Sequence, residues 1–198
     1  MISSQVYTKN QIEKLGNTLI FLCQQLYPPV SKTHLLKLIF IIEEISVKKF
    51  GIPFFDLRFD VWKLGPVSKD LYVELSEDLI LLEPYIRKEV KENSTIVFSK
   101  KDFSDDEFND NEIDLLNEIA NRFKYCTAGE LINFTHKKDT PWYNTAQRNG
   151  VLELLESGKM TTTNFEINLA EIIEDDKDKL MMYQGHKEFL SQSKSLKI

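Results

Sequence analysis

The most restrictive feature of the sequence is a stretch between Ser31 and Gly51 that is apolar on nearly every side when it is drawn as a helix. A helix of this kind has to be enclosed by other elements of the fold. It is too short to cross a membrane, because Lys32 and Lys37 bound one end and Glu43 and its neighbours bound the other, leaving far fewer than the roughly 18 uncharged residues that a span needs. We therefore expect a buried central helix around which the rest of the chain packs.

Local capping patterns predict where this helix and several others begin and end. Ser31 can cap the central helix, and Gly51 followed by Pro53 marks its end. A first helix ends at Pro28 and Pro29, and Thr140 before Pro141 starts a late one. Three capping boxes predict further helix starts: Thr8 with Gln11, Ser104 with Glu107, flanked by Phe103 and Phe108 as a hydrophobic staple, and Thr127 with Glu130.

Between Leu57 and Lys63 the apolar period changes to two, which predicts a half-buried strand. Trp62 falls on the outer face of this strand, so we expect its ring to be exposed. Gly65 and Pro66 force a turn, because glycine can supply a positive φ and proline fixes φ and removes a donor. A helix from about Val67 to Asp78 follows this turn.

Two further strands, at residues 86–90 and 95–98, flank a polar tetrad and predict a β-hairpin. Together with the strand at Leu57–Lys63 they would make a small antiparallel sheet of up to three strands. The expected fold class is α+β and predominantly α-helical, with a helical core around the buried central helix and a small antiparallel, winged-helix-like β-sheet.

The pattern weakens after Gly150. Residues 151–155 could form a helical turn, residues 160–164 are a threonine-rich connector, and residues 169–190 have helical spacing. The last eight residues are expected to be disordered. We divide the chain into a main domain, residues 1–150, and an acidic helical extension, residues 151–198, packed on or flanking that domain.

Two landmarks, about seventy residues apart, carry a family resemblance. The first is Leu36-Lys37-Leu38-Ile39 early in the central helix, then Gly51-Ile52-Pro53, then Trp62 with Gly65 and Pro66. The second is Thr135-His136 shortly before Pro141-Trp142. In this order they resemble the Panacea domain family, over roughly residues 10–150.

The resemblance implies a non-enzymatic antitoxin of a bacterial or phage-associated toxin–antitoxin pair, which neutralises a cognate protein toxin, encoded by an adjacent gene, through direct binding. The alternatives are an adaptor that delivers a client protein to a protease, and a transcriptional regulator. Our candidate partner-binding residues are Trp62, Lys63, Gly65, Pro66, His136 and Trp142.

Composition narrows the classes of function. The net charge of −6 argues against a general nucleic-acid binder, whose domain is usually basic. The segment after Pro66 has Lys69 against four carboxylates, which disfavours a DNA-recognition helix. Zinc-ligand, phosphate-loop and esterase motifs are missing from the sequence, so we expect neither catalytic residues nor a metal or other cofactor. Cys23 and Cys126 fit buried free thiols, and the polar N-terminus carries no signal peptide pattern, so we expect a cytoplasmic protein with no membrane partner.

Several residues allow both a structural and a binding role. His136 can bond the carbonyls that end a helix and Trp142 can fill a gap between helices, or the two can form a recognition pocket. Trp62, if exposed, has the composition of a binding hot spot. The run from Asp102 to Glu118 has eight carboxylates and no basic residue. It favours a solvated helix face, with a docking surface for a basic partner as the second interpretation.

Overall fold

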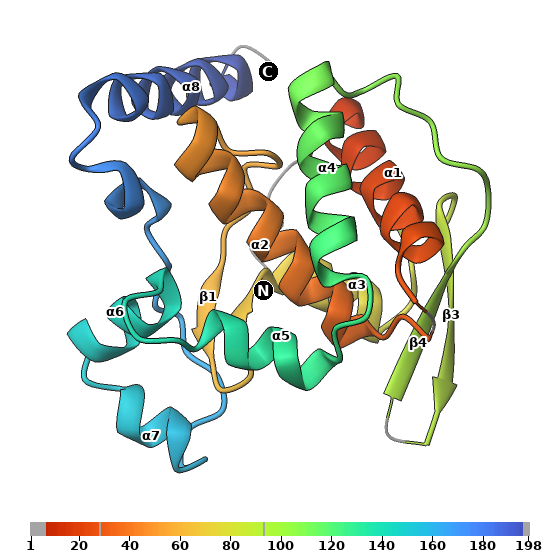
Figure 1. Cartoon of the computed structure of the whole chain (residues 1–198), viewed down its shortest axis with the longest axis horizontal. Helices are drawn as coiled ribbons and strands as arrows, with labels where there is room; N and C mark the ends of the chain where they lie inside the picture. Colours follow the sequence, from red (N-terminus) through yellow and green to blue (C-terminus); the bar gives the residue numbers. More distant parts are fainter. Residues whose placement is uncertain (1–6, 28, 93, 196–198) are drawn as a thin grey trace.

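The fold is built around α2, which runs through the middle of the molecule (Figure 1). The structure is a computed structural model that describes residues 7–27, 29–92 and 94–195. Its elements in chain order are α1 (Lys9–Gln25), α2 (Lys32–Phe50), β1 (Asp60–Trp62), β2 (Gly65–Val67), α3 (Lys69–Ser76), β3 (Ile86–Lys91), β4 (Ser94–Ser99), α4 (Asp110–Phe123), α5 (Ala128–Thr135), α6 (Pro141–Arg148), α7 (Leu152–Glu156), a 3-10 helix (Leu169–Ile173) and α8 (Lys177–Ser195). The predicted α+β, predominantly helical class is confirmed.

The central helix is buried as its sequence predicts. Its side chains from Leu35 to Glu43 are all buried, and its apolar ones make up the middle of one continuous hydrophobic core. The predicted ends are confirmed, because the Ser31 hydroxyl accepts the backbone N–H of His34 and Gly51 ends the helix in the left-handed conformation, at φ 68°. This helix contacts β2, β4, α3, α4, α5, α8 and the 3-10 helix, so it fixes their relative positions.

The predicted starts of α1, α5 and α6 are confirmed at Thr8, Thr127 and Thr140. Pro28, expected to help end the first helix, lies outside the described residues. The predicted start of a helix near Asp105 is wrong, because α4 begins at Asp110 with Asn109 and Glu112 as its capping box. The Ser104 hydroxyl instead donates to the Asp106 carboxylate, at 2.7 Å.

The predicted three-stranded sheet is also wrong. Within the described residues, the strands form two separate two-stranded antiparallel sheets, β1 with β2 and β3 with β4. The predicted strand at Leu57–Lys63 shrinks to Asp60–Trp62, since the backbone N–H of Leu57 bonds to the buried Glu43 carboxylate instead of to a strand. The turn lies at residues 63–64, and Gly65 and Pro66 already belong to the returning strand.

The segment after Gly150 packs along the main body. Residues 161–167 run beside β1, through bonds from Val61 N–H to the Phe165 carbonyl and from Ile167 N–H to the Phe59 carbonyl, at 3.0 and 2.8 Å. Farther on, α8 lies at the C-terminal end of α2 (Figure 1), where Lys187 pairs with Asp56. The expectation of disorder from residue 191 is wrong for its described part, because α8 continues to Ser195.

Candidate functional site

The first sequence landmark forms the β1–β2 hairpin. The register pairs Asp60 with Val67 and Trp62 with Gly65, so the two strands are joined by Lys63 and Leu64. Gly65 has a φ of 101°, a conformation that L side chains rarely adopt. This glycine therefore lets the chain reverse within two residues.

The second landmark lies directly against the hairpin. His136 ends α5 and Trp142 lies in the first turn of α6, where Pro141 is a favourable start. The indole N–H of Trp142 donates to the Trp62 carbonyl at 2.9 Å, and the side chain of Trp142 is only 1% exposed. The His136 and Trp142 rings are in contact at a tilt of 46°, with centroids 3.8 Å apart. The two landmarks thus form one site.

His136 is placed between two carbonyl oxygens. Its Nε2 lies 3.0 Å from the Lys63 oxygen, and its Nδ1 lies 2.6 Å from the Ile132 oxygen. A neutral imidazole has one N–H and can donate to one of the two, whereas the protonated ring would satisfy both. Burial lowers the pKa of His136, the two carbonyl contacts oppose this shift, and the nearby Lys37 ammonium adds to it.

Lys37 completes the site from α2, although it is not among the site residues predicted from the sequence. Its side chain is 1% exposed, and its ammonium donates to the Pro66 carbonyl at 2.9 Å. Burial lowers the pKa of Lys37 to about 7. The sequence does carry one indication of a buried Lys37. A lysine on a helix that is apolar all round cannot reach water, so it needs a polar partner inside the protein.

A side chain at position 65 would crowd the neighbours of the hairpin. A Cβ atom there would lie 2.9 Å from Thr135 Oγ1 and 3.1 Å from both His136 Cε1 and Lys37 Cε. The side of β1 away from β2 is covered by the later segment, where the Thr163 hydroxyl donates to the Val61 carbonyl at 2.6 Å. We call Lys37, His136, Trp142 and Thr163 the hairpin anchor, because each has a side-chain nitrogen or oxygen within hydrogen-bond distance of a carbonyl oxygen of residues 61–66.

The expected exposure of Trp62 is wrong. Its ring is half-buried against Tyr72, with centroids 5.0 Å apart, and its N–H donates to the Thr163 carbonyl at 3.2 Å. The structure brings all six predicted site residues together. Gly65, Pro66 and Trp142 are buried, Trp62 and His136 are half-buried, and Lys63 is exposed beside Leu64, whose exposed fraction is 55%. Most of the predicted binding residues therefore hold the hairpin, and its two-residue tip faces solvent.

A family model described as "Antitoxin SocA-like, Panacea domain" matches residues 35–143. The chain belongs to this family. The Panacea match contains both landmarks and three members of the hairpin anchor, while Thr163 and the whole of α1 and α8 lie outside it. The resemblance predicted from the landmarks is confirmed. No curated protein and no solved structure matches the chain.

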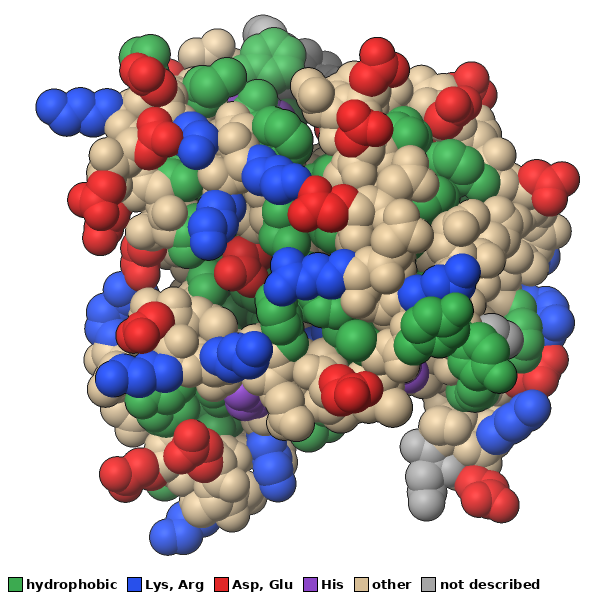
Figure 2. All heavy atoms as spheres, viewed as in Figure 1, with side chains coloured by type: hydrophobic (Ala, Val, Ile, Leu, Met, Phe, Trp, Pro, Cys, Tyr) green, Lys and Arg blue, Asp and Glu red, His purple; other side chains and the backbone are tan. Residues whose placement is uncertain are grey.

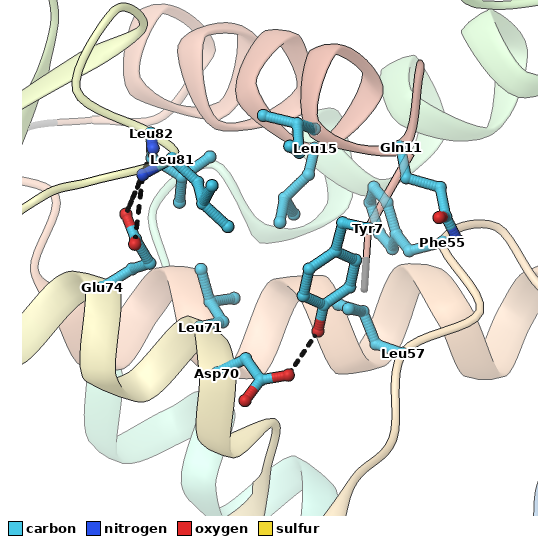
Figure 3. A pocket seen from close by; sticks show the side chains of 11 residues that line it. Tyr7, Gln11, Leu15, Phe55, Leu57, Asp70, Leu71, Glu74, Leu81 and Leu82 are labelled. Atoms are coloured by element: carbon cyan, nitrogen blue, oxygen red, sulfur yellow. Dashed lines mark hydrogen bonds between the residues drawn. The ribbon is translucent and has the colours of Figure 1, made fainter. Parts of the chain in front are cut away.

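A second feature of this Panacea protein, an apolar void between α1 and α3, does not offer a ligand site (Figure 3). Tyr7 lies across it and donates its hydroxyl to the Asp70 carboxylate at 2.7 Å, while Leu15, Leu71 and Leu82 line it. Its volume is about 30 Å³, the share of one water molecule in the liquid, whereas ligand pockets run from roughly 300 to 1,000 Å³. The void is a packing gap.

The described residues form neither a metal-binding cluster nor a membrane-spanning helix. Among residues 7–27, 29–92 and 94–195, no group of three or more His, Cys, Asp or Glu side chains could hold a metal ion. Over the same ranges, none of the helices has both the length and the apolar character needed to cross a membrane. Cys23 and Cys126 are free and half-buried, and burial raises the pKa of the Cys23 thiol to about 12, which disfavours the reactive thiolate.

Proposed function

We propose that this protein is a non-enzymatic antitoxin that neutralises a cognate protein toxin in the cytoplasm by direct binding, with the tip of the β1–β2 hairpin in the contact. The observation that carries the proposal is the family match over a region containing both landmarks. The tip presents an exposed Leu64 next to an exposed Lys63, an apolar and a cationic group that a protein surface can accept together.

The hairpin anchor supports a binding role for the tip through preorganisation. Four side chains from α2, α5, α6 and the later segment fix the carbonyls on both sides of Lys63 and Leu64. A loop fixed before binding loses little conformational entropy in the complex, so more of the contact energy appears as affinity. Under this proposal Gly65, Pro66, His136 and Trp142 act by positioning the tip, and Lys63, Leu64 and the exposed part of Trp62 touch the partner.

The test is co-expression with the product of the adjacent gene, following growth and co-purification together. We expect the neighbour to arrest growth alone, and this protein to restore growth and to co-elute with it. Leu64→Asp should abolish both effects without unfolding the chain. Val90→Asp is the matched control, because Val90 is a 75% exposed aliphatic residue at the end of the other hairpin.

Three results would contradict the proposal, in whole or in part. Restored growth with protease-dependent loss of the neighbour would indicate the adaptor function instead of occlusion. An adjacent gene product that is harmless and does not co-elute would remove the antitoxin function for this member of the family. Equal effects of Leu64→Asp and Val90→Asp would remove the hairpin tip from the contact while leaving the antitoxin function in place.

A further inference from the structure

A groove of about 660 Å³ lies between the first turns of α1, the segment just after Gly51 and the approach to α4, with α8 at one end. It is separate from the β1–β2 hairpin tip. In Figure 2 acidic side chains gather near the N-terminal end of α4, beside the hollow between this helix and α8. The volume falls within the range of protein ligand pockets, so the groove has room for several side chains of a partner.

The groove is acidic at its rim and apolar inside. Ile52, with an exposed fraction of 36%, and the half-buried Phe108 and Leu190 supply apolar surface. Within the lining, Lys14 is the sole Lys or Arg, whereas five carboxylates line the groove. They are Glu13, Asp56, Asp106, Glu107 and Glu112.

Several of these carboxylates are held in place by neighbouring groups. Glu107 accepts the Asn17 side-chain amide at 3.0 Å, Asp106 accepts the Ser104 hydroxyl at 2.7 Å, and Asp56 pairs with Lys187. A carboxylate that is already ordered loses little side-chain entropy when a cation approaches it. Glu13, Asp56 and Glu112 are already paired with Lys9, Lys187 and Lys14. The preorganised negative charge of the rim therefore lies at Asp106 and Glu107.

Lys14 shows which chemistry the groove accepts. Its ammonium lies 2.5 Å from the Glu112 carboxylate, 4.4 Å from the centre of the Phe54 ring and 5.9 Å from that of Phe108. A carboxylate and two aromatic faces around one ammonium bind it through an ion pair and cation–π contacts. The protein's own lysine is thus bound by the same kinds of group that line the rest of the groove.

We propose that this groove binds a basic, amphipathic segment of a partner protein, with lysine or arginine side chains on the acidic rim and apolar side chains against Ile52 and Phe108. This proposal depends on the proposed antitoxin function in one respect, which is that the partner is a protein. Under this proposal, the residues of the acidic run 102–118 that line the groove have a docking role.

The first test uses a labelled helical peptide with lysine and leucine on opposite faces, titrated with the full chain by fluorescence anisotropy. The Glu13→Gln, Asp106→Asn, Glu107→Gln triple variant should bind about tenfold more weakly, since each exposed pair contributes a fraction of a kcal/mol. The matched control, Glu174→Gln, Asp175→Asn, Asp178→Asn, removes the same charge from exposed residues at the start of α8, away from the groove. It should bind within about twofold of the parent, because bulk charge is screened at physiological salt.

Equal weakening in the two triple variants would overturn the proposal, because the peptide would then sense only net charge. Absence of binding, or equal binding of a peptide with glutamate in place of lysine, would overturn it as well. Carbodiimide cross-linking of the peptide lysines to the unmodified protein is a second measurement that does not depend on variants folding. Cross-links should map to Glu13, Asp106 or Glu107, and cross-links confined to other carboxylates would contradict the groove. Growth rescue without peptide binding would contradict the groove proposal and leave the antitoxin function in place. Peptide binding without growth rescue would contradict the antitoxin function and leave the groove proposal in place.

Discussion

The β1–β2 hairpin has strands of three mostly buried residues and an exposed two-residue tip, whereas the β3–β4 hairpin has strands of six residues that are largely half-buried or exposed. β3–β4 is held by its own ladder of six residue pairs, and Val90 near its turn is 75% exposed. β1–β2 has three such pairs, and its remaining carbonyls are bonded by the hairpin anchor. The β3–β4 ladder is twice as long, and Val97 N–H also ties it to the Val30 carbonyl at 2.9 Å, whereas the short β1–β2 ladder is supplemented by four side chains from other elements.

The two hairpins differ in what holds the turn in position. Most backbone bonds of β3–β4 lie within its own ladder, and the bond from Val97 N–H to the Val30 carbonyl ties this hairpin to the core. The β1–β2 hairpin depends more on side chains of other elements, because its carbonyls are contacted from α2, α5, α6 and the later segment. The family landmarks lie in and around the β1–β2 hairpin. In this protein the landmark residues therefore act mainly to fix the position of a short turn.

The largest expected effect on this comparison comes from Trp142. Trp142→Ala should lower the free energy of unfolding by about 3–5 kcal/mol, because it removes a buried indole and leaves the Trp62 carbonyl without its donor. Phe98→Ala, at a half-buried aromatic residue of β4, should cost less than half as much. Chemical denaturation of both variants measures the difference, and equal losses would contradict the division between the two hairpins.

A pH-dependent effect is expected from Lys37. Its pKa is lowered from 10.5 to about 7 in the folded protein, so between these values the unfolded chain binds more protons and stability rises with pH. Below about pH 7 this contribution is constant. Lys37→Met should abolish the rise, which amounts to at most about 2.7 kcal/mol between pH 7 and 9. Lys48→Met, at an exposed lysine of the same helix, is the control. Parallel urea-unfolding profiles for Lys37→Met and the parent would refute the assignment.

Gly65→Ala should destabilise the fold by about 1–3 kcal/mol, because alanine is strained at φ 101° and its Cβ would meet Thr135 and His136. Gly129→Ala is its matched control in α5, where the nearest atom to an added Cβ is 3.9 Å away. That change should stabilise the helix by about 0.5–1 kcal/mol. Thermal melting of the pair should give shifts of opposite sign, and a stable Gly65→Ala protein would show that the hairpin is looser than described.

The smallest effect is expected in the surface hairpin. Val90→Thr should change the free energy of unfolding by less than about 0.5 kcal/mol, because the side chain already lies in solvent and threonine suits a strand equally well. Urea unfolding measures it. A loss comparable to that of Gly65→Ala would mean that β3–β4 is as strongly coupled to the core as β1–β2.

The sequence predicted what depends on residues close together along the chain. The starts of α1, α2, α5 and α6 follow from capping side chains within three residues of the bonds they make, and the β3–β4 hairpin follows from two adjacent strands. The start of α4 was missed because two capping boxes follow each other closely, and sequence alone does not decide between Ser104 and Asn109.

The sequence predicted which residues form most of the site, but it did not predict how they are arranged. The landmarks named five of its buried or half-buried residues, but the exposure expected for Trp62 assumed an open outer face on β1. That face is covered by residues 161–167, whose threonine-rich sequence carries little strand pattern and lies about a hundred positions away. From the sequence, Lys37 is interpreted only as a charge near the start of the central helix. The carbonyl partner that its buried ammonium needs is supplied only by the folded chain.

The placement of residues 161–167 beside β1 has a consequence for how the chain is made. Trp62 and Thr163 are 101 positions apart, so β1 leaves the ribosome long before the residues that cover it. At a synthesis rate of about 5–20 residues per second, that delay is roughly 5 to 20 s. During this time an unpaired strand edge is available to other chains. The nascent protein can complete the anchored hairpin only after its C-terminal segment has emerged.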